Sequence, residues 1–150
     1  MRLVLALCLL LLAACGTVTE VLTPAPAGPV AVSGQYWIAI QDRFGLTPDE
    51  RAELFDAAAG QLGGAKVAMG TAGAMELRIT VTNYRATGIG NRQAGGTPGG
   101  DFVESIVHVV DPASRRVLRE ERVVTRNRRA IGSEPLLREH GRDVVAAIAR

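Results

Sequence analysis

The stretch Met75-Glu76-Leu77-Arg78-Ile79-Thr80-Val81-Thr82 alternates between apolar and polar side chains without a break. Successive side chains of a strand point to opposite faces of a sheet, so this pattern predicts a strand over residues 75–84 with one face in a core and the other in water. An apolar sheet face has to be covered by another layer. The rest of the chain must therefore supply that layer and the neighbouring strands.

Three further segments read as strands. Residues 36–42 include Trp37, Ile38 and Ile40 and predict a buried first strand. Residues 102–110 and 117–125 are apolar-rich, and Asp111-Pro112-Ala113-Ser114 between them suits a type I turn, so they predict an antiparallel hairpin. Residues 66–69 are a candidate for one more short strand.

Two segments predict helices. Thr47, Pro48 and Glu50 form a capping box with a proline in the first turn, and Gly63-Gly64 ends the segment. Ser133 is the predicted cap of a last helix with Pro135 in its first turn. Both helices carry an apolar face at helical spacing: Leu54, Phe55, Ala58 and Leu62 in the first, and Leu137, His140, Val144 and Ile148 in the second.

The predicted order is strand, helix, strand, strand, strand, helix. This order indicates an α+β fold, with a mainly antiparallel sheet of about four strands and two helices packed on one face. We expect residues 35–150 to form a single domain, because this length suffices for one hydrophobic core.

The N-terminal segment resembles the signal peptide of a bacterial lipoprotein. Arg2 precedes an apolar run over residues 3–12, which is shorter than the roughly 20 residues that span a bilayer. Leu12-Ala13-Ala14-Cys15 then matches the four positions of a lipobox. The resemblance implies a cleaved signal peptide over 1–14, lipid such as palmitate on Cys15, and a proline-rich tether over 15–34. An ordinary secretory signal is the alternative.

In lipoproteins of this kind, glycine rather than aspartate after the acylated cysteine implies sorting to the outer membrane. Gly16 occupies that position, so the resemblance implies an envelope protein that is lipid-anchored in the outer membrane and faces the periplasm. Cleavage would remove Cys8 and leave Cys15 as the only cysteine. We therefore expect no disulfide in the mature chain.

Charge is distributed unevenly along the chain. Residues 17–114 contain six basic and ten acidic residues, a net charge of −4, and residues 115–150 contain ten basic and five acidic residues, a net charge of +5. The basic part indicates either a solvated surface or a site for an anionic partner. Nucleic acid is not an expected partner of an exported protein.

Few residues of the sequence are candidates for a nucleotide, metal or catalytic site. The glycine-rich stretch 87–100 lacks a following helix and a Gly-Lys-Ser/Thr motif, so it does not predict a nucleotide site. It predicts a long hairpin loop, and a loop that contacts a partner is the alternative. His108 and His140 are the only histidines and have no second ligand close in sequence, so no metal or other cofactor is expected. Ser105 and His108, three apart on a strand, should point to opposite faces.

Several other polar residues have structural explanations. Asp101 could complete a catalytic triad with Ser105 and His108. That triad cannot form if the side chains of Ser105 and His108 point to opposite faces of the strand. Asp49 and Glu50 indicate a helix start, and Glu120 and Glu121 a solvent-exposed strand edge. We therefore predict no catalytic residue, and Cys15 is the only residue given a specific chemical role, as the lipidation site.

A second resemblance covers the later part of the chain. Residues 77–84, the glycine-rich stretch, residues 109–118 and the last helix are similar to small proteobacterial lipoprotein domains of unknown function. The match is weaker at Ser114-Arg115, where those domains have Thr-Gly. The resemblance implies an α+β envelope lipoprotein. The proline-rich tether, the lipid anchor and the lack of catalytic clusters favour a non-enzymatic binding or structural role with an envelope protein as partner. The alternatives are a subunit of an envelope secretion or transport complex, or an exported hydrolase.

Overall fold

A computed structural model describes residues 34–86, 100–127 and 132–149. The predicted signal peptide, Cys15, almost all of the tether and residues 87–99 of the glycine-rich stretch lie outside these ranges. The elements are β1 Tyr36–Asp42, α2 Pro48–Leu62, the short 3-10 helix η1 Gly63–Ala65, β2 Met75–Arg85, β3 Asp101–Asp111, β4 Arg116–Asn127 and α4 Ser133–Ile148.

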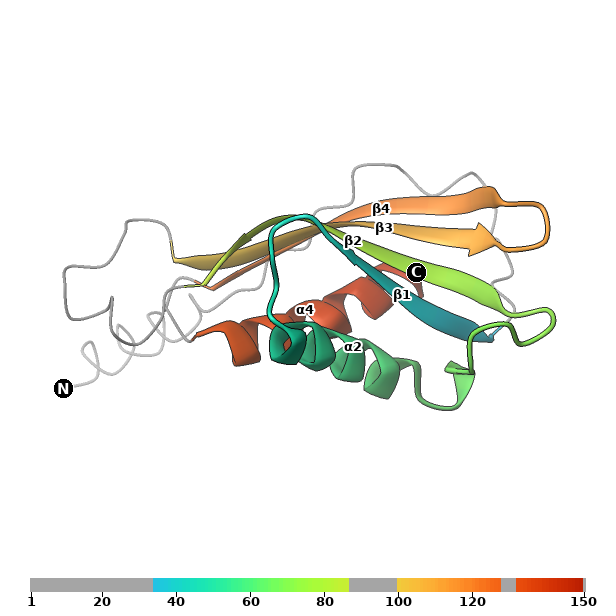
Figure 1. The fold of residues 1–150 in the computed structure, drawn as a ribbon, viewed down its shortest axis with the longest axis horizontal. Helices are drawn as coiled ribbons and strands as arrows, with labels where there is room; N and C mark the ends of the chain where they lie inside the picture. Colours follow the sequence, from blue (N-terminus) through green and yellow to red (C-terminus); the bar gives the residue numbers. More distant parts are fainter. Residues whose placement is uncertain (1–33, 87–99, 128–131, 150) are drawn as a thin grey trace, which may run out of the picture.

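The four strands form one sheet in the order β1-β2-β3-β4. β1 runs parallel to β2, since α2 carries the chain back between them, and the β2–β3 and β3–β4 pairs are antiparallel. Both helices lie on the same side of the sheet (Figure 1). The predicted α+β class and the predicted element order are confirmed.

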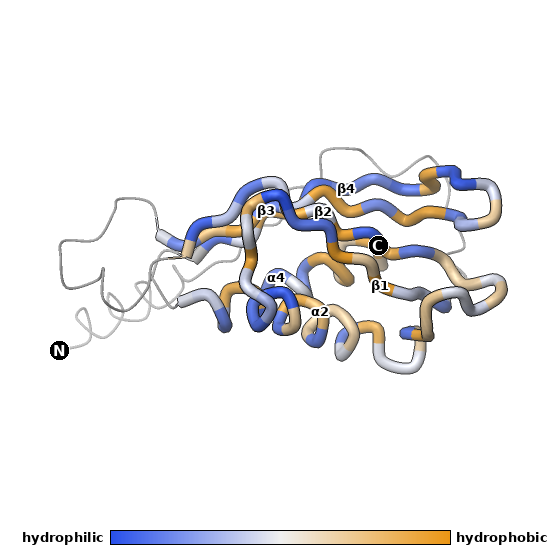
Figure 2. The backbone as a smooth tube through the Cα atoms, viewed as in Figure 1, coloured by the Kyte–Doolittle hydropathy of each residue, from blue (hydrophilic) through white to orange (hydrophobic). Residues whose placement is uncertain are grey.

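The inner face of the sheet supplies half of the core. Leu77, Ile79 and Val81 of β2 are fully buried, as their alternation predicts. The expectation that the other face of β2 is wet is only partly right, because Glu76 and Thr80 are each 8 % exposed. Their neighbours on the flanking strands shield them. The alternation of polar and apolar residues is visible along β3 and β4 in Figure 2.

The start of α2 has the predicted capping box. Glu50 donates its backbone N–H to Thr47 Oγ1, and the Glu50 carboxylate accepts the Thr47 backbone N–H at 3.0 Å. The prediction for α4 is wrong in one detail. Gly132, and not Ser133, is the N-cap residue, and it has a φ of 97°, which is the left-handed region that favours glycine.

The β3–β4 connection has the predicted turn chemistry. Asp111 accepts hydrogen bonds from the backbone N–H of Ala113 at 3.0 Å and from the Ser114 hydroxyl at 2.6 Å. The candidate strand at 66–69 is reduced to one bridge, in which Lys66 pairs in parallel with Tyr36. That bridge lies beside the outer edge of β1.

Candidate functional site

A chain of four polar side chains crosses the interface between the sheet and α4. His140 of α4 contacts the Ser105 hydroxyl of β3 through Nε2 and the Thr125 hydroxyl of β4 through Nδ1, each at 2.8 Å. Thr125 in turn donates to Asp143 Oδ2 at 2.7 Å. Ser105, Thr125 and His140 have no exposed surface. The chain therefore ties three elements together inside the core.

The protons of this chain can be assigned from its donors and acceptors. Thr125 has a single hydroxyl hydrogen and gives it to Asp143, so Thr125 Oγ1 accepts from the Nδ1–H of His140. Nε2 is then the acceptor for the Ser105 hydroxyl. Burial lowers the pKa of His140 to about 3, because desolvation penalises the imidazolium form. His140 is therefore neutral at pH 7.

A serine hydroxyl that donates to an imidazole is the arrangement from which a general base activates a nucleophile. Here the imidazole is oriented by a threonine hydroxyl, and the carboxylate of Asp143 is one step further away. Ser105 Oγ also lies inside the core, where a substrate has no approach in this conformation. The geometry fits a polar tie between elements better than a nucleophile.

The other candidate catalytic residues, His108 and Asp101, do not take part in the hydrogen-bonded chain around His140. His108 points to the outer face, opposite to Ser105 as predicted, and its Nε2 lies 2.8 Å from Glu120 Oε2. Asp101 accepts the backbone N–H of Gly132 at 3.1 Å and so fixes the start of α4. The triad of Ser105, His108 and Asp101 is thus not assembled, as predicted.

One predicted surface carboxylate is buried. Glu121 has no exposed surface, although its neighbour Glu120 is exposed as expected. Glu121 faces the helices, and the Arg119 guanidinium binds it at 2.8 Å. Arg119 also donates to the carbonyl of Ile148 at 2.8 Å, at the C-terminal end of α4. An inward ion pair on an outer strand cannot be recognised from a run of four consecutive charged residues, Arg119-Glu120-Glu121-Arg122.

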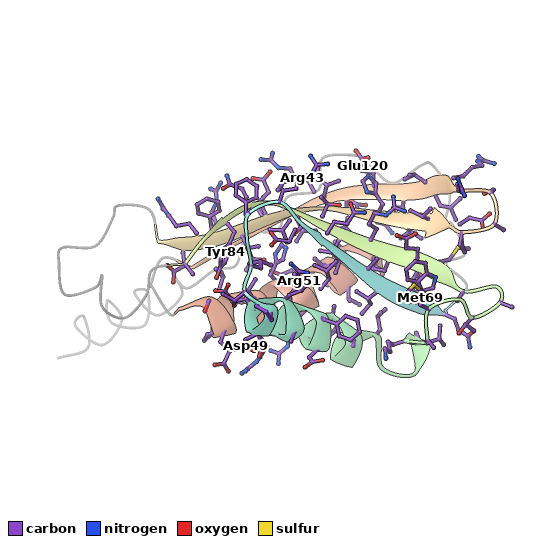
Figure 3. The ribbon with its side chains drawn as sticks, in the orientation of Figure 1. Arg43, Asp49, Arg51, Met69, Tyr84 and Glu120 are labelled. Atoms are coloured by element: carbon purple, nitrogen blue, oxygen red, sulfur yellow. The ribbon has the colours of Figure 1, made fainter. Side chains whose placement is uncertain are left out.

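Tyr84 joins the end of β2 to the start of α2. The Tyr84 side chain, which is labelled in Figure 3, lies on the side of the sheet that faces α2. Its hydroxyl donates to Glu50 Oε1 at 2.6 Å. Burial and the contact with Glu50 raise the pKa of Tyr84. Burial alone would raise the pKa of Glu50, but hydrogen bonds from Tyr84 and Thr47 outweigh it and lower that pKa. Glu50 is therefore held as a carboxylate that organises this end of the fold.

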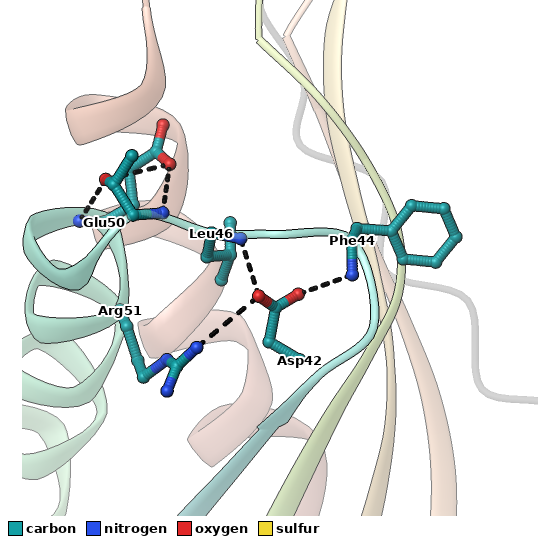
Figure 4. Close-up of polar contacts among 6 residues, drawn as sticks. Asp42, Phe44, Leu46, Glu50 and Arg51 are labelled. Carbon is teal, nitrogen blue, oxygen red and sulfur yellow. Dashed lines mark hydrogen bonds and ion pairs between the residues drawn. The ribbon is translucent and has the colours of Figure 1, made fainter.

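A groove lies between β1 and the first turns of α2. Its volume is about 470 Å³, and its lining residues are Ile40, Leu46, Pro48, Arg51, Ala52, Phe55 and Asp56. Asp42 shapes the loop beside it by accepting the backbone N–H of Phe44 at 2.8 Å and of Leu46 at 2.6 Å (Figure 4). Sequence reasoning missed this groove, because its residues have ordinary helix and strand patterns.

Metal ligands do not gather in the described part of the chain. Among residues 34–86, 100–127 and 132–149, no three His, Cys, Asp or Glu side chains lie close enough together to hold a metal ion. Within the same residues, no helix is long and apolar enough to cross a membrane.

No protein-family model matches the chain, and no curated protein matches it. Among solved structures, a methionine variant of the PelC dodecamer from Paraburkholderia phytofirmans is similar with a TM-score of 0.59 and 18% identity, and the match covers 89% of this chain and 97% of that one. A second structure of the PelC dodecamer gives a TM-score of 0.58 at 18% identity with the same coverage. These likenesses show the fold.

A third similar structure is a "putative lipoprotein" from Caulobacter crescentus. Its TM-score is 0.45 and its identity 14%, and the match covers 75% of this chain and 87% of that one.

Proposed function

We propose that this chain is an envelope lipoprotein that is anchored through lipid on Cys15 and faces the periplasm, and that its folded domain has a binding or structural role. The lipobox Leu12-Ala13-Ala14-Cys15 carries the proposal. A single acyl chain holds a protein to a membrane only marginally, whereas two or more anchor it stably. A proline-rich tether between the anchor and β1 lets the domain stand away from the lipid surface.

The buried polar chain around His140 supports a non-enzymatic role. Among the described residues, Ser105 and His140 are arranged as a nucleophile and its general base would be, but neither has exposed surface. Their contacts are accounted for by the packing of α4 on the sheet.

Metabolic labelling with palmitate tests the anchor, and the chain supplies its own matched control. We expect Cys15→Ala to abolish labelling and to release the protein from the membrane fraction, because the acyl acceptor is lost. Cys8→Ala should leave labelling and membrane attachment unchanged, because Cys8 belongs to the removed segment. Continued labelling of Cys15→Ala would refute the proposal.

The sorting of the lipoprotein is tested separately. We expect Gly16→Asp to keep the palmitate label and to move the protein from the outer to the inner membrane fraction. An unchanged distribution of Gly16→Asp on a density gradient would contradict the outer-membrane location and leave the anchor intact.

A second candidate function is a subunit of an envelope assembly. The match to the PelC dodecamer covers 97% of that chain, so both chains have the whole domain in common. Identical subunits assemble either through one self-complementary surface or through two different complementary surfaces. Native mass spectrometry of the full chain tests this candidate, since a monomer at every concentration would contradict self-assembly.

A further inference from the structure

The two outer strands of the sheet differ in how they are protected. Outer strands present unpaired backbone groups, and inward-pointing charges, bulges or prolines usually prevent another strand from pairing there. β4 has the inward ion pair of Arg119 and Glu121, and the β3–β4 register is irregular at Val109/Val110. β1 has no proline, and its single charge, Asp42, lies at its last position. β1 is therefore the less protected edge.

The free backbone groups of β1 can be assigned from its bonded ones. The carbonyl of Gln35 accepts the N–H of Met75 on the β2 side, and the carbonyl of Tyr36 accepts the N–H of Val67 on the opposite side at 2.8 Å. The backbone N–H and C=O groups of successive residues in a strand point to opposite sides. Those of Ile38 and Ile40 therefore point away from β2, as the Tyr36 carbonyl does.

Residues 66 and 67 lie beside β1, where a fifth strand of the sheet would lie, and the backbone then turns away. Lys66 forms its single parallel bridge with Tyr36. After Val67 the backbone turns, with the Thr71 N–H bonded to the Ala68 carbonyl at 3.2 Å. Among the described residues, no other segment pairs with β1 beyond Tyr36 on this side. Within residues 34–86, 100–127 and 132–149, the edge next to Ile38 and Ile40 is therefore open.

The groove lies beside this open edge. Ile40 contributes the side chain that faces the helices, and Ala52 and Phe55 of α2 form the opposite wall. A strand added next to β1 would point every second side chain into this apolar space. The edge and the groove together supply both parts of strand recognition, which are main-chain hydrogen bonds and side-chain pockets.

Charge at the groove selects a feature of the incoming segment. The Arg51 side chain is 52% exposed, and its guanidinium lies 3.6 Å from Asp42 Oδ2. The guanidinium has five N–H donors and this ion pair engages one of its terminal nitrogens, so Arg51 retains donors for another carboxylate (Figure 4). Asp56, which would repel a carboxylate, lies about 7.5 Å further along α2, because a helix rises 1.5 Å per residue. The carboxylate of the bound segment is therefore expected at the Arg51 end of the groove.

We propose that the open edge of β1 and the groove of α2 bind an extended segment of a partner protein as a fifth strand. Its inward side chains are apolar, and one acidic residue contacts Arg51. This inference rests on the proposed binding role and names its site and the class of its partner. It does not depend on the lipid anchor, so its test and the palmitate test fail independently.

A synthetic peptide serves as the probe. Valine and threonine alternate along the peptide, so that the valines share one face, and one glutamate occupies the last position on the valine face. Trp37 is the only tryptophan and lies in β1, so its fluorescence reports on binding to the purified full chain. We expect a saturable fluorescence change, and chemical-shift changes of the Ile38 and Ile40 amides. The same peptide with N-methyl groups on its edge-facing amides should not bind.

Matched variants locate the site. We expect Ala52→Tyr, which fills the groove, to weaken binding about tenfold, whereas Ala146→Tyr on the exposed face of α4 leaves it unchanged. Arg51→Glu should weaken binding of the glutamate peptide about fivefold and favour a lysine peptide instead. Arg142→Glu, on the exposed side of α4, is its control.

Four results would overturn the proposal. One is saturable binding that N-methylation does not affect, and a second is binding that Ala52→Tyr does not weaken. A third is an equal Trp37 response to decanoate, which would assign the groove to lipid. The fourth is a full chain that is oligomeric without peptide and becomes monomeric with Ala52→Tyr, which would assign the edge to a second copy.

Discussion

Gly141 of α4 lies against Ala57 of α2 at a distance that leaves no room for a side chain. A Cβ at Gly141 would lie 2.7 Å from Ala57 Cβ and 2.9 Å from the Leu54 carbonyl oxygen. Contacts below 3.0 Å with backbone atoms cannot be relieved by a side-chain rotation. The glycine therefore allows the close approach of the two helices that cover the sheet.

We expect Gly141→Ala to lower the free energy of unfolding by about 2 kcal/mol. Alanine is preferred over glycine inside a helix by about 1 kcal/mol, but overpacking of a close contact costs roughly 1–3 kcal/mol and here involves backbone atoms. Urea unfolding measures the difference. Gly60→Ala in α2 is the control, since nothing lies within 4 Å of its Cβ position and the helix preference alone should stabilise it. A stabilised Gly141→Ala would contradict the packing.

The burial of His140 predicts a loss of stability in acid. Its folded pKa is about 3 against 6.5 for an ordinary histidine, so below pH 6.5 the unfolded chain binds a proton that the folded chain does not. Stability is therefore complete above pH 6.5 and falls as the pH decreases toward 3. The slope reaches about 1.4 kcal/mol per pH unit for one proton.

Urea unfolding between pH 7 and 5 checks this slope, since most carboxylates titrate below that range. We expect His140→Leu to have a flatter profile, because its site has no proton to bind. The variant should also be less stable at pH 7, since Ser105 and Thr125 lose their partner. Equal slopes for the two proteins would contradict the assignment.

The elements were predictable where local chemistry determines them. Thr47 and Glu50 define the start of α2 because a capping box depends only on neighbours in sequence. The alternation in β2 identifies its inner face for the same reason. The prediction of Ser133 as the cap of α4 is wrong, because Gly132 is the N-cap residue and its positive φ begins the helix without a side-chain hydrogen bond.

The polar interior was not predictable from local pattern. His140 and Ser105 are separated by 35 positions, and their contact depends on how α4 crosses the sheet. Glu121 reads as a solvent-exposed residue because its neighbours are charged, and its inward direction follows from strand phase. Both cases need the tertiary arrangement, because burial of a polar residue depends on a partner that is distant in sequence.

Arg119 and Glu121 should show the behaviour of a buried ion pair. We expect Arg119→Leu to destabilise the protein by about 3 kcal/mol, because it leaves the Glu121 carboxylate buried without its cation. The double variant Arg119→Leu/Glu121→Leu should recover most of this loss, since no uncompensated charge remains. A double-mutant cycle in urea measures the coupling, and additive losses would contradict it.

The same double variant tests the protection of β4. Removal of the inward charges leaves the inward face of this edge strand without a charge, so we expect the double variant to aggregate faster than the wild type under conditions where both are folded. Light scattering below the unfolding transition measures this. Equal aggregation rates would show that the ion pair of Arg119 and Glu121 does not protect the edge.

Ser105 provides a test that separates a structural tie from a nucleophile. Its hydroxyl donates to His140 as an activated serine would, but Ser105 has no exposed surface. We expect a fluorophosphonate probe to leave Ser105 unlabelled in the folded protein, because the reagent cannot reach Oγ. Ser105→Ala should lower the free energy of unfolding by about 1–2 kcal/mol through the lost hydrogen bond. Labelling of Ser105 that Ser105→Ala and His140→Leu abolish would show that the core opens to admit a substrate, and it would restore the exported hydrolase as the better explanation.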